Sequence, residues 1–148
     1  MVGKSKVVIA VENKGDRTGY VKMSLVNRVS GEEILKTMWK NLDLDTRLRS
    51  DGWCFYGILG KKIKAHEKIV VGKGSQASKL LPWVHTMIEN VKGILRGVHH
   101  GISSKHSGKY LAEFCYKTNR RFWESQLFNR LLHACLNTTT MTFAELRV

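Results

Sequence analysis

The sequence predicts an α/β fold in a single domain, and three observations support this. The 148 residues are 43% apolar, which is enough for one hydrophobic core. Runs of β-branched residues concentrate in residues 1–71, and helical periodicity dominates residues 80–136. Residues 137–148 form a polar tail with a short apolar end. We therefore expect a mixed sheet flanked by helices, with a helical carboxyl-terminal extension.

The individual elements follow from local patterns. A β-branched run, a turn with Lys14-Gly15-Asp16 at its tip and a partly alternating return run predict a hairpin. Ser30 is expected to cap the first helix, with Glu33 as its capping-box partner. The expected strands are residues 6–12, 19–26, 46–50 and 66–71. The expected helices are residues 30–42, 53–59, 82–96, 104–118 and 122–136.

The helix over residues 82–96 is expected to carry two different stripes. Its apolar stripe consists of Val84, Ile88, Val91 and Leu95. A polar stripe lies one residue later, roughly 100° around the helix, and consists of His85, Glu89, Lys92 and Arg96. The helix should therefore pack through one side and present a mostly cationic flank on another.

The order of elements is strand, strand, helix, strand ending in an acid, helix, strand and long helix. This is the order of an RNase H-like domain without its first strand. In such domains acids at strand ends and a ligand on a late helix hold magnesium ions. Asp51, at the end of the strand over residues 46–50, fits the second of these positions. On spacing alone, an ordinary turn at Asp51-Gly52 is the commoner interpretation.

The charge of the chain predicts a polyanionic partner. The formal net charge is +13, and residues 61–121 hold 13 lysines and arginines against three acids. Residues 1–50 are closer to balance, with ten against six. A basic surface that only confers solubility is the alternative, but concentration of the charge in one half favours a directed binding face.

Cysteine usage and hydropathy predict an intracellular protein. Cys54, Cys115 and Cys135 form no C-x-x-C pair, so we expect buried free thiols in a reducing compartment. The apolar runs are too short for a signal peptide core or a membrane span. We therefore expect a soluble, intracellular protein.

Several motifs in order resemble the ISXO-like group of bacterial insertion-sequence transposases. They are Ser50-Asp51-Gly52-Trp53, His66, Leu81-Pro82-Trp83-Val84-His85, His99-His100-Gly101, Lys105-His106, Tyr110-Leu111 with Glu113-Phe114, and Asn119-Arg120-Arg121. The resemblance covers roughly residues 7–136, and it implies a location in the bacterial cytoplasm, at the nucleoid when the chain is bound to DNA. It implies an RNase H-like fold and a DDE-type reaction, in which metal-bound water cleaves the transposon end and the freed 3′ hydroxyl attacks target DNA. The implied cofactor is Mg²⁺ or Mn²⁺, and the implied partners are transposon ends, target DNA and, in a homo-oligomer, further copies of the chain.

Carried over to this sequence, the resemblance makes Asp51 the second metal ligand and places the third on residues 83–92. Asn90 stands where one branch of the group has an acid, and it would coordinate through its carbonyl oxygen without contributing charge. By resemblance we expect Asn90 to be the third ligand. Glu89, which precedes it and shares the polar stripe with His85, is the alternative. The resemblance also implies contacts with DNA. The residues expected there are Lys92, Arg96, His99, His100, Lys105, His106, Lys117, Asn119, Arg120 and Arg121.

Alternatives stay open for some of these residues. The three histidines could act as general acids or metal ligands instead of phosphate contacts or helix caps, and Lys117, Arg120 and Arg121 could be a solvated helix end. Trp53, Trp83 and Trp123 are expected in the core rather than as platforms for base stacking.

The resemblance departs from the family pattern at the amino terminus. The family's first Asp stands on a strand before the one over residues 6–12, and no acid between Met1 and Val11 replaces it. We therefore expect an amino-terminally truncated domain with an unpaired sheet edge. Such a chain should coordinate metal weakly and cut DNA feebly or not at all. The alternative is a non-catalytic basic DNA-binding remnant of a decayed transposase, and an RNA-binding module is a third, weaker interpretation.

Overall fold

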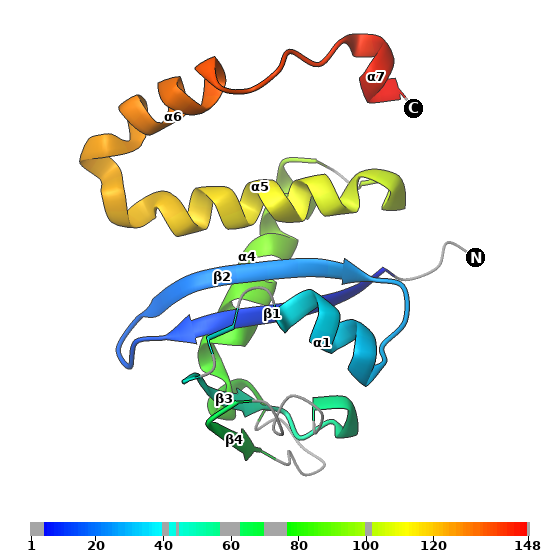
Figure 1. The fold of residues 1–148 in the computed structure, drawn as a ribbon, viewed down its shortest axis with the longest axis vertical. Coiled ribbons are helices and arrows are strands. Elements are labelled where there is room, and N and C mark those ends of the chain that lie inside the picture. The colour runs from blue at the N-terminus through cyan, green and yellow to red at the C-terminus, as the bar shows by residue number, and fades with distance from the viewer. Residues whose placement is uncertain are drawn as a thin grey trace.

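The computed structural model describes residues 5–39, 42–43, 45–56, 63–69, 77–99 and 102–147. It has an α/β fold, as expected, in which a long hairpin lies between helices (Figure 1). The strands are β1 (Lys6–Asn13), β2 (Thr18–Val26), β3 (Arg47–Ser50) and β4 (Ala65–Lys68). The α-helices are α1 (Gly31–Trp39), α3 (Ala77–Leu80), α4 (Pro82–Gly97), α5 (Ser107–Arg120), α6 (Leu127–Leu136) and α7 (Phe143–Arg147). Short 3₁₀ turns are η1 (Cys54–Tyr56), η2 (Ser104–His106) and η3 (Arg121–Gln126).

The predicted hairpin is confirmed. β1 and β2 pair antiparallel, with Val7 opposite Leu25 and Val11 opposite Val21. Gly15 lies at the tip with φ +87°, a left-handed conformation that glycine adopts without steric cost. The turn is closed further by the Asn13 side chain, whose Oδ1 accepts the Gly15 N–H at 2.8 Å.

The start of α1 follows the capping-box prediction only in part. Ser30 Oγ accepts the Glu33 N–H at 3.3 Å, as an N-cap should. The Glu33 carboxylate reaches beyond the N-cap and accepts the backbone N–H groups of Asn27 at 2.9 Å and Arg28 at 2.7 Å. These two hydrogen bonds, with that of Asn27 having the larger effect, hold the pKa of the Glu33 carboxyl below its usual value.

The strands form two separate sheets, whereas we expected one mixed sheet. β1–β2 is antiparallel and β3–β4 is parallel, with Leu48 opposite His66. Among the strands that the structure describes, none pairs with both β1 and β3, so the two ladders are not joined. Within the described residues, β1 pairs with β2 alone.

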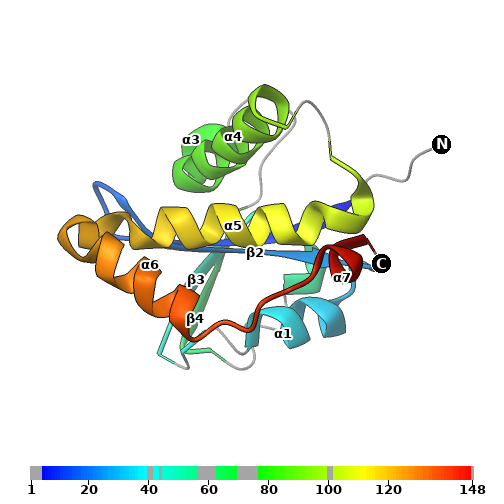
Figure 2. The ribbon, with the colours of Figure 1, turned by 90° about the horizontal axis from the view of Figure 1, so that it is seen from above.

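Two apolar cores lie on opposite faces of the hairpin. One face packs against α4 and α5 through Val21, Met23, Met87, Val91, Leu111, Phe114 and Cys115. The other packs against α1 through Val8, Val26, Ile34 and Met38, with Leu48 of β3 at its margin. Figure 2 shows α4 and α1 on either side of the hairpin, as the alternation of side chains along a strand requires.

The packed side of α4 differs from the predicted apolar stripe. Met87 and Val91 are buried, and Leu95 packs against them, whereas Val84 and Ile88 are only half-buried. The buried set is therefore rotated toward Met87, which joins the core shared by the hairpin and α5.

Three further expectations are corrected. Trp53 is 46% exposed and does not lie in the core. Cys54 and Cys135 are exposed, and only Cys115 is buried. The expected helix over residues 122–136 is interrupted at Trp123, whose φ of −128° and ψ of 51° are not helical. No helix in the part of the chain that the structure describes is long and apolar enough to cross a membrane.

Candidate functional site

Asp51 lies at the carboxyl end of β3 with an exposed carboxylate. Its Oδ1 accepts the Trp53 N–H at 3.3 Å, and Gly52 between them has φ +80°. This turn places the carboxylate at the rim of the parallel β3–β4 pair, where the sequence predicted an acid. The pKa of the Tyr56 hydroxyl is raised, mainly because the hydroxyl is buried and to a lesser degree because of the negative charge of Asp51.

Next to Asp51, Ser50 and His66 form a polar pair that the sequence did not predict. Ser50 is 6% exposed, and its Oγ lies 2.9 Å from His66 Nε2 on β4. The same Oγ accepts the Gly52 N–H at 3.4 Å, which joins the pair to the turn that carries Asp51. Burial, and after it the charge of Lys68, lowers the pKa of His66. The signal that could have found this contact was parallel pairing of the strands over residues 46–50 and 66–71.

The polar flank of α4 is confirmed as one surface. Glu89 is exposed and forms an ion pair with Lys92 at 2.9 Å. The hydrogen bond and charge of Lys92, and more weakly the charges of Arg96 and His85, hold the pKa of Glu89 below its usual value. The three basic side chains therefore act electrostatically on Glu89, as residues spaced along one side of a helix should.

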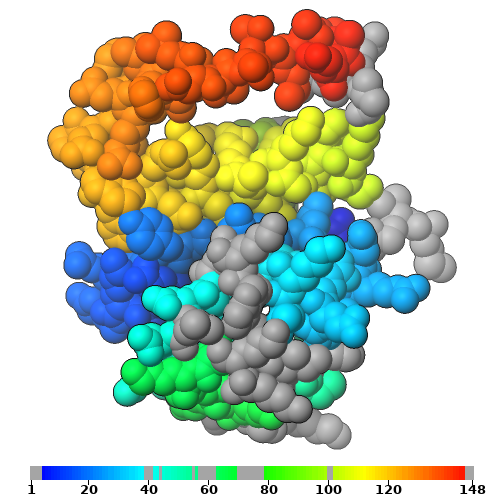
Figure 3. Space-filling view, in the orientation of Figure 1, coloured from blue at the N-terminus to red at the C-terminus, as the bar shows by residue number. Residues whose placement is uncertain are grey.

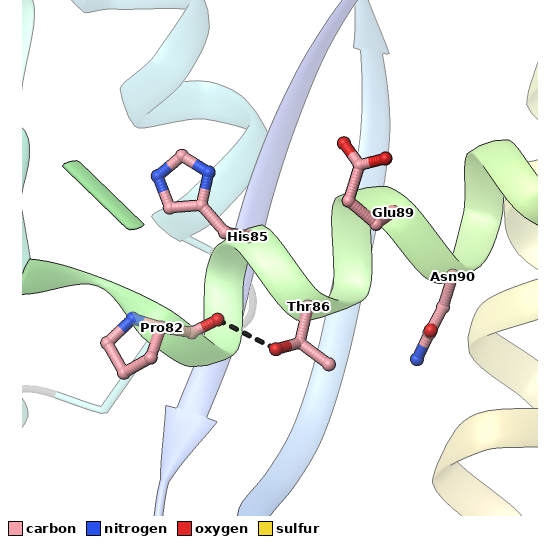
Figure 4. Close-up of a pocket in the computed structure, with 5 residues that line it drawn as sticks. All are labelled: Pro82, His85, Thr86, Glu89 and Asn90. Atoms are coloured by element: carbon pink, nitrogen blue, oxygen red, sulfur yellow. Dashed lines mark hydrogen bonds between the residues drawn. The ribbon is translucent and has the colours of Figure 1, made fainter. Parts of the chain in front are cut away.

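A surface pocket lies at the start of α4 and is lined by Pro82, His85, Thr86, Glu89 and Asn90. Figure 4 shows His85 and Glu89 on one side of the helix and Asn90 pointing to the opposite side. Asn90 also lines a second pocket, together with Phe114, Thr118 and Arg121 of the α5 region. Glu89, rather than Asn90, thus shares a side of the helix with His85.

Glu89 and Asn90 of α4 line one pocket, whereas Asp51 lies at the carboxyl end of β3 and lines neither of these two pockets. Within the described residues, no group of three or more His, Cys, Asp or Glu side chains is placed to hold a metal ion. The oxygen donors of Asp51, Glu89 and Asn90 suit Mg²⁺ chemically.

The predicted DNA contacts fall into two groups. The first consists of exposed lysines and arginines together with two partly buried histidines. Arg96 and Lys105 are exposed. Lys92 and Lys117 are exposed as well, but each forms an ion pair within its own helix, with Glu89 at 2.9 Å and Glu113 at 2.5 Å. His99 lies against Tyr110, with 4.3 Å between ring centroids, and His106 is half-buried. His100 lies outside the described residues.

The second group fastens α5 to the hairpin. Asn119 Nδ2 donates to the Val21 carbonyl at 2.8 Å, and its Oδ1 accepts the Val21 N–H at 2.7 Å. Arg121 Nη2 donates to the carbonyls of Thr18 at 2.7 Å and Gly19 at 3.1 Å. The Arg120 guanidinium stacks 3.4 Å above the Tyr116 ring. Asn119 and Arg121 therefore satisfy the free edge of β2, a role that spacing alone could not reveal.

Comparison with known proteins identifies the class. A family model for the ISXO2-like transposase domain matches residues 1–119, which span β1 to nearly the end of α5. The fold and this match together define a transposase-type protein. The chain belongs to the family of ISXO2-like transposase domains, which ties it to DNA transposition and to DNA as a partner. No curated protein and no solved structure matches the chain.

Proposed function

We propose that this chain binds the DNA of an insertion sequence along the cationic flank of α4 and the adjoining surface of α5, and takes part in metal-dependent cleavage and strand transfer. The observation that carries the proposal is the shared flank of His85, Glu89, Lys92 and Arg96 inside the family match.

The binding half of the proposal rests on charge. Residues 61–121 carry 13 lysines and arginines against three acids, and each phosphate that a cation neutralises releases counterions and adds affinity. Arg96 is exposed near the carboxyl end of α4, so it is the first candidate for a phosphate contact. Lys92 and Lys117 would exchange a weak surface ion pair for a phosphate, at small cost.

The cleavage half rests on oxygen donors. Asp51 would hold Mg²⁺ or Mn²⁺ together with a residue of α4. The resemblance favours Asn90 for this role, whereas Glu89 shares its side of the helix with His85. Bound metal would supply activation of water and stabilisation of the charged phosphate oxygens. Within the described residues no group of three or more His, Cys, Asp or Glu side chains is placed to hold a metal ion, so this half of the proposal depends on the cleavage experiment below.

The second candidate is a basic DNA-binding protein without catalysis. The observation that favours it is that, in the described part of the chain, no three metal-binding side chains come together. On this alternative Glu89 serves only to pair with Lys92 on the surface of α4.

DNA binding is tested by fluorescence anisotropy with a duplex of about 30 base pairs over a range of NaCl concentrations. Arg96→Glu should weaken binding by about tenfold or more and reduce the salt slope by about one, because a phosphate contact is lost. Lys36→Glu is the matched control, since Lys36 is equally exposed on α1, across the hairpin from α4. Equal effects of the two variants would contradict the proposed surface.

Cleavage is tested with DNA that carries the terminal inverted repeats, in Mg²⁺ or Mn²⁺. Nicking that disappears in Asp51→Ala but persists in Asp45→Ala supports the catalytic proposal, since Asp45 is an exposed acid near β3 that pairs with Lys64 at 3.4 Å. Salt-sensitive binding with no nicking at any metal concentration supports the alternative. Comparison of Glu89→Gln with Asn90→Ala then assigns the ligand on α4.

A further inference from the structure

The carboxyl-terminal arm, residues 121–147, carries an apolar surface that the rest of the described chain does not cover. It lies beyond the family match, which ends at residue 119. No residue of η3 or α6 is buried. In Figure 1 the arm runs back above α5, and Figure 3 shows open space between the two.

The side chains of α6 divide into two halves. One half is apolar and consists of Leu127, Phe128, Leu131, Leu132, Cys135 and Leu136. The opposite half carries Asn129, Arg130 and His133, so the helix is amphipathic. In the apolar half Phe128 is 75% exposed and Leu136 is 76% exposed. A helix of this type in a globular protein normally buries its apolar half.

The charge of α6 indicates what does not bind there. Arg130, on the polar half, stacks 4.5 Å from the Trp123 ring and bonds to Gln126. The apolar half holds no cation to meet a phosphate. A nucleic acid is therefore a poor partner for this half, although the chain as a whole is strongly basic.

The exposed area fits a dimer of modest affinity. Complete burial of the apolar half of α6 would remove roughly 500–600 Å² per chain, or about 1,000–1,200 Å² for two copies. That total is at the lower limit for a specific interface and corresponds to the weak, reversible class. One self-complementary patch is enough for a two-fold symmetric pair, because each copy presents the same surface to the other.

We infer that the apolar half of α6 is a docking surface for α6 of a second copy of this chain. The two helices pack through Phe128, Leu131 and Leu132, and the copies associate in the micromolar range. Two chains of charge +13 repel each other, so association becomes stronger as salt screens that repulsion. This dependence is opposite in sign to that of any assembly bridged by nucleic acid.

The experiment is sedimentation equilibrium of the 148-residue chain, freed of nucleic acid by nuclease, from about 1 to about 200 µM. The mass should rise from 16.9 kDa toward twice that value, with a lower dissociation constant at about 500 mM NaCl than at about 50 mM. Phe128→Asp with Leu132→Asp should raise the dissociation constant at least ~30-fold. The matched control is Asn129→Asp with His133→Asp, which adds acids to the polar half of the same helix and should leave association within about twofold of the wild type.

Cysteine alkylation provides a second readout without any variant. Cys135 lies on the apolar half of α6, and Cys54 is exposed elsewhere. Protection of Cys135 from iodoacetamide should grow with protein concentration, while the reactivity of Cys54 stays constant. The inference is overturned if the wild type stays monomeric throughout, if the Phe128 and Leu132 variant associates like the wild type, or if association weakens with salt.

Discussion

Asn119 offers the sharpest test of how α5 is held against the hairpin. Its amide makes two hydrogen bonds with the backbone of Val21, at 2.7 and 2.8 Å. Val21 is 1% exposed, so water cannot readily replace the amide in Asn119→Ala. Each backbone group left without a partner costs about 1–3 kcal/mol. We therefore expect the free energy of unfolding to fall by about 2–6 kcal/mol, a large part of the ~5–15 kcal/mol typical of a domain.

Urea unfolding followed by circular dichroism measures this change. Asn129→Ala is the control, because Asn129 is exposed on α6 and should change stability by less than about 0.5 kcal/mol. Asn119→Asp should be at least as costly as Asn119→Ala, because it keeps an acceptor for the Val21 N–H but sets a carboxylate against the Val21 carbonyl. If Asn119→Ala is as stable as Asn129→Ala, the amide does not secure the edge of β2.

Other variants follow from burial, backbone and charge. Met87→Ala should lower the free energy of unfolding by about 2–5 kcal/mol in the same urea assay, and a loss below ~1 kcal/mol would place Met87 outside the core. Gly93→Ala should stabilise by about 0.5–1 kcal/mol, since a Cβ there meets nothing within 4 Å, whereas Gly52→Ala should destabilise by about 1–2 kcal/mol because its φ is +80°. Because the pKa of His66 is lowered in the folded chain, the unfolded chain takes up a proton first as pH falls. The contribution of His66 to stability is therefore complete above its ordinary pKa of 6.5 and is lost as pH falls below that value. The fall in urea midpoint between about pH 7.5 and about pH 5.5 should therefore be smaller in His66→Gln, and an unchanged fall would remove His66 as its source.

Local patterns predicted most of the elements, because their signals lie within a few residues. The hairpin tip at Gly15, the N-cap at Ser30 and the polar flank of α4 each depend on backbone preferences or helical spacing that a single sequence shows. The burial of α4 was less predictable. Its packed side depends on which neighbours it meets, so Met87 replaced Val84 and Ile88 in the core.

Contacts distant in sequence were missed for the same reason. Ser50 and His66 meet only because β3 and β4 pair in parallel, and Asn119 meets Val21 across 98 positions. The Arg120-Arg121 pair was predicted to contact DNA because it is cationic. In the structure the Arg121 guanidinium instead donates hydrogen bonds to backbone carbonyls of the hairpin. The RNase H-like arrangement and the roles of Asp51, Glu89 and Asn90 in catalysis remain predictions for the experiments above.

The last residues that fasten α5 to β2 also mark a change in what constrains the sequence. Up to Arg121, a substitution is constrained mainly by whether the new side chain still packs in the folded domain. Phe122 and Trp123 of η3 still contact Tyr20 of β2, whereas no residue of α6 is buried, so α6 is free to diverge, or to be exchanged for another helix, while the fold persists. Related elements could thus acquire new assembly preferences by altering a few carboxyl-terminal codons and leave the DNA-handling surface intact.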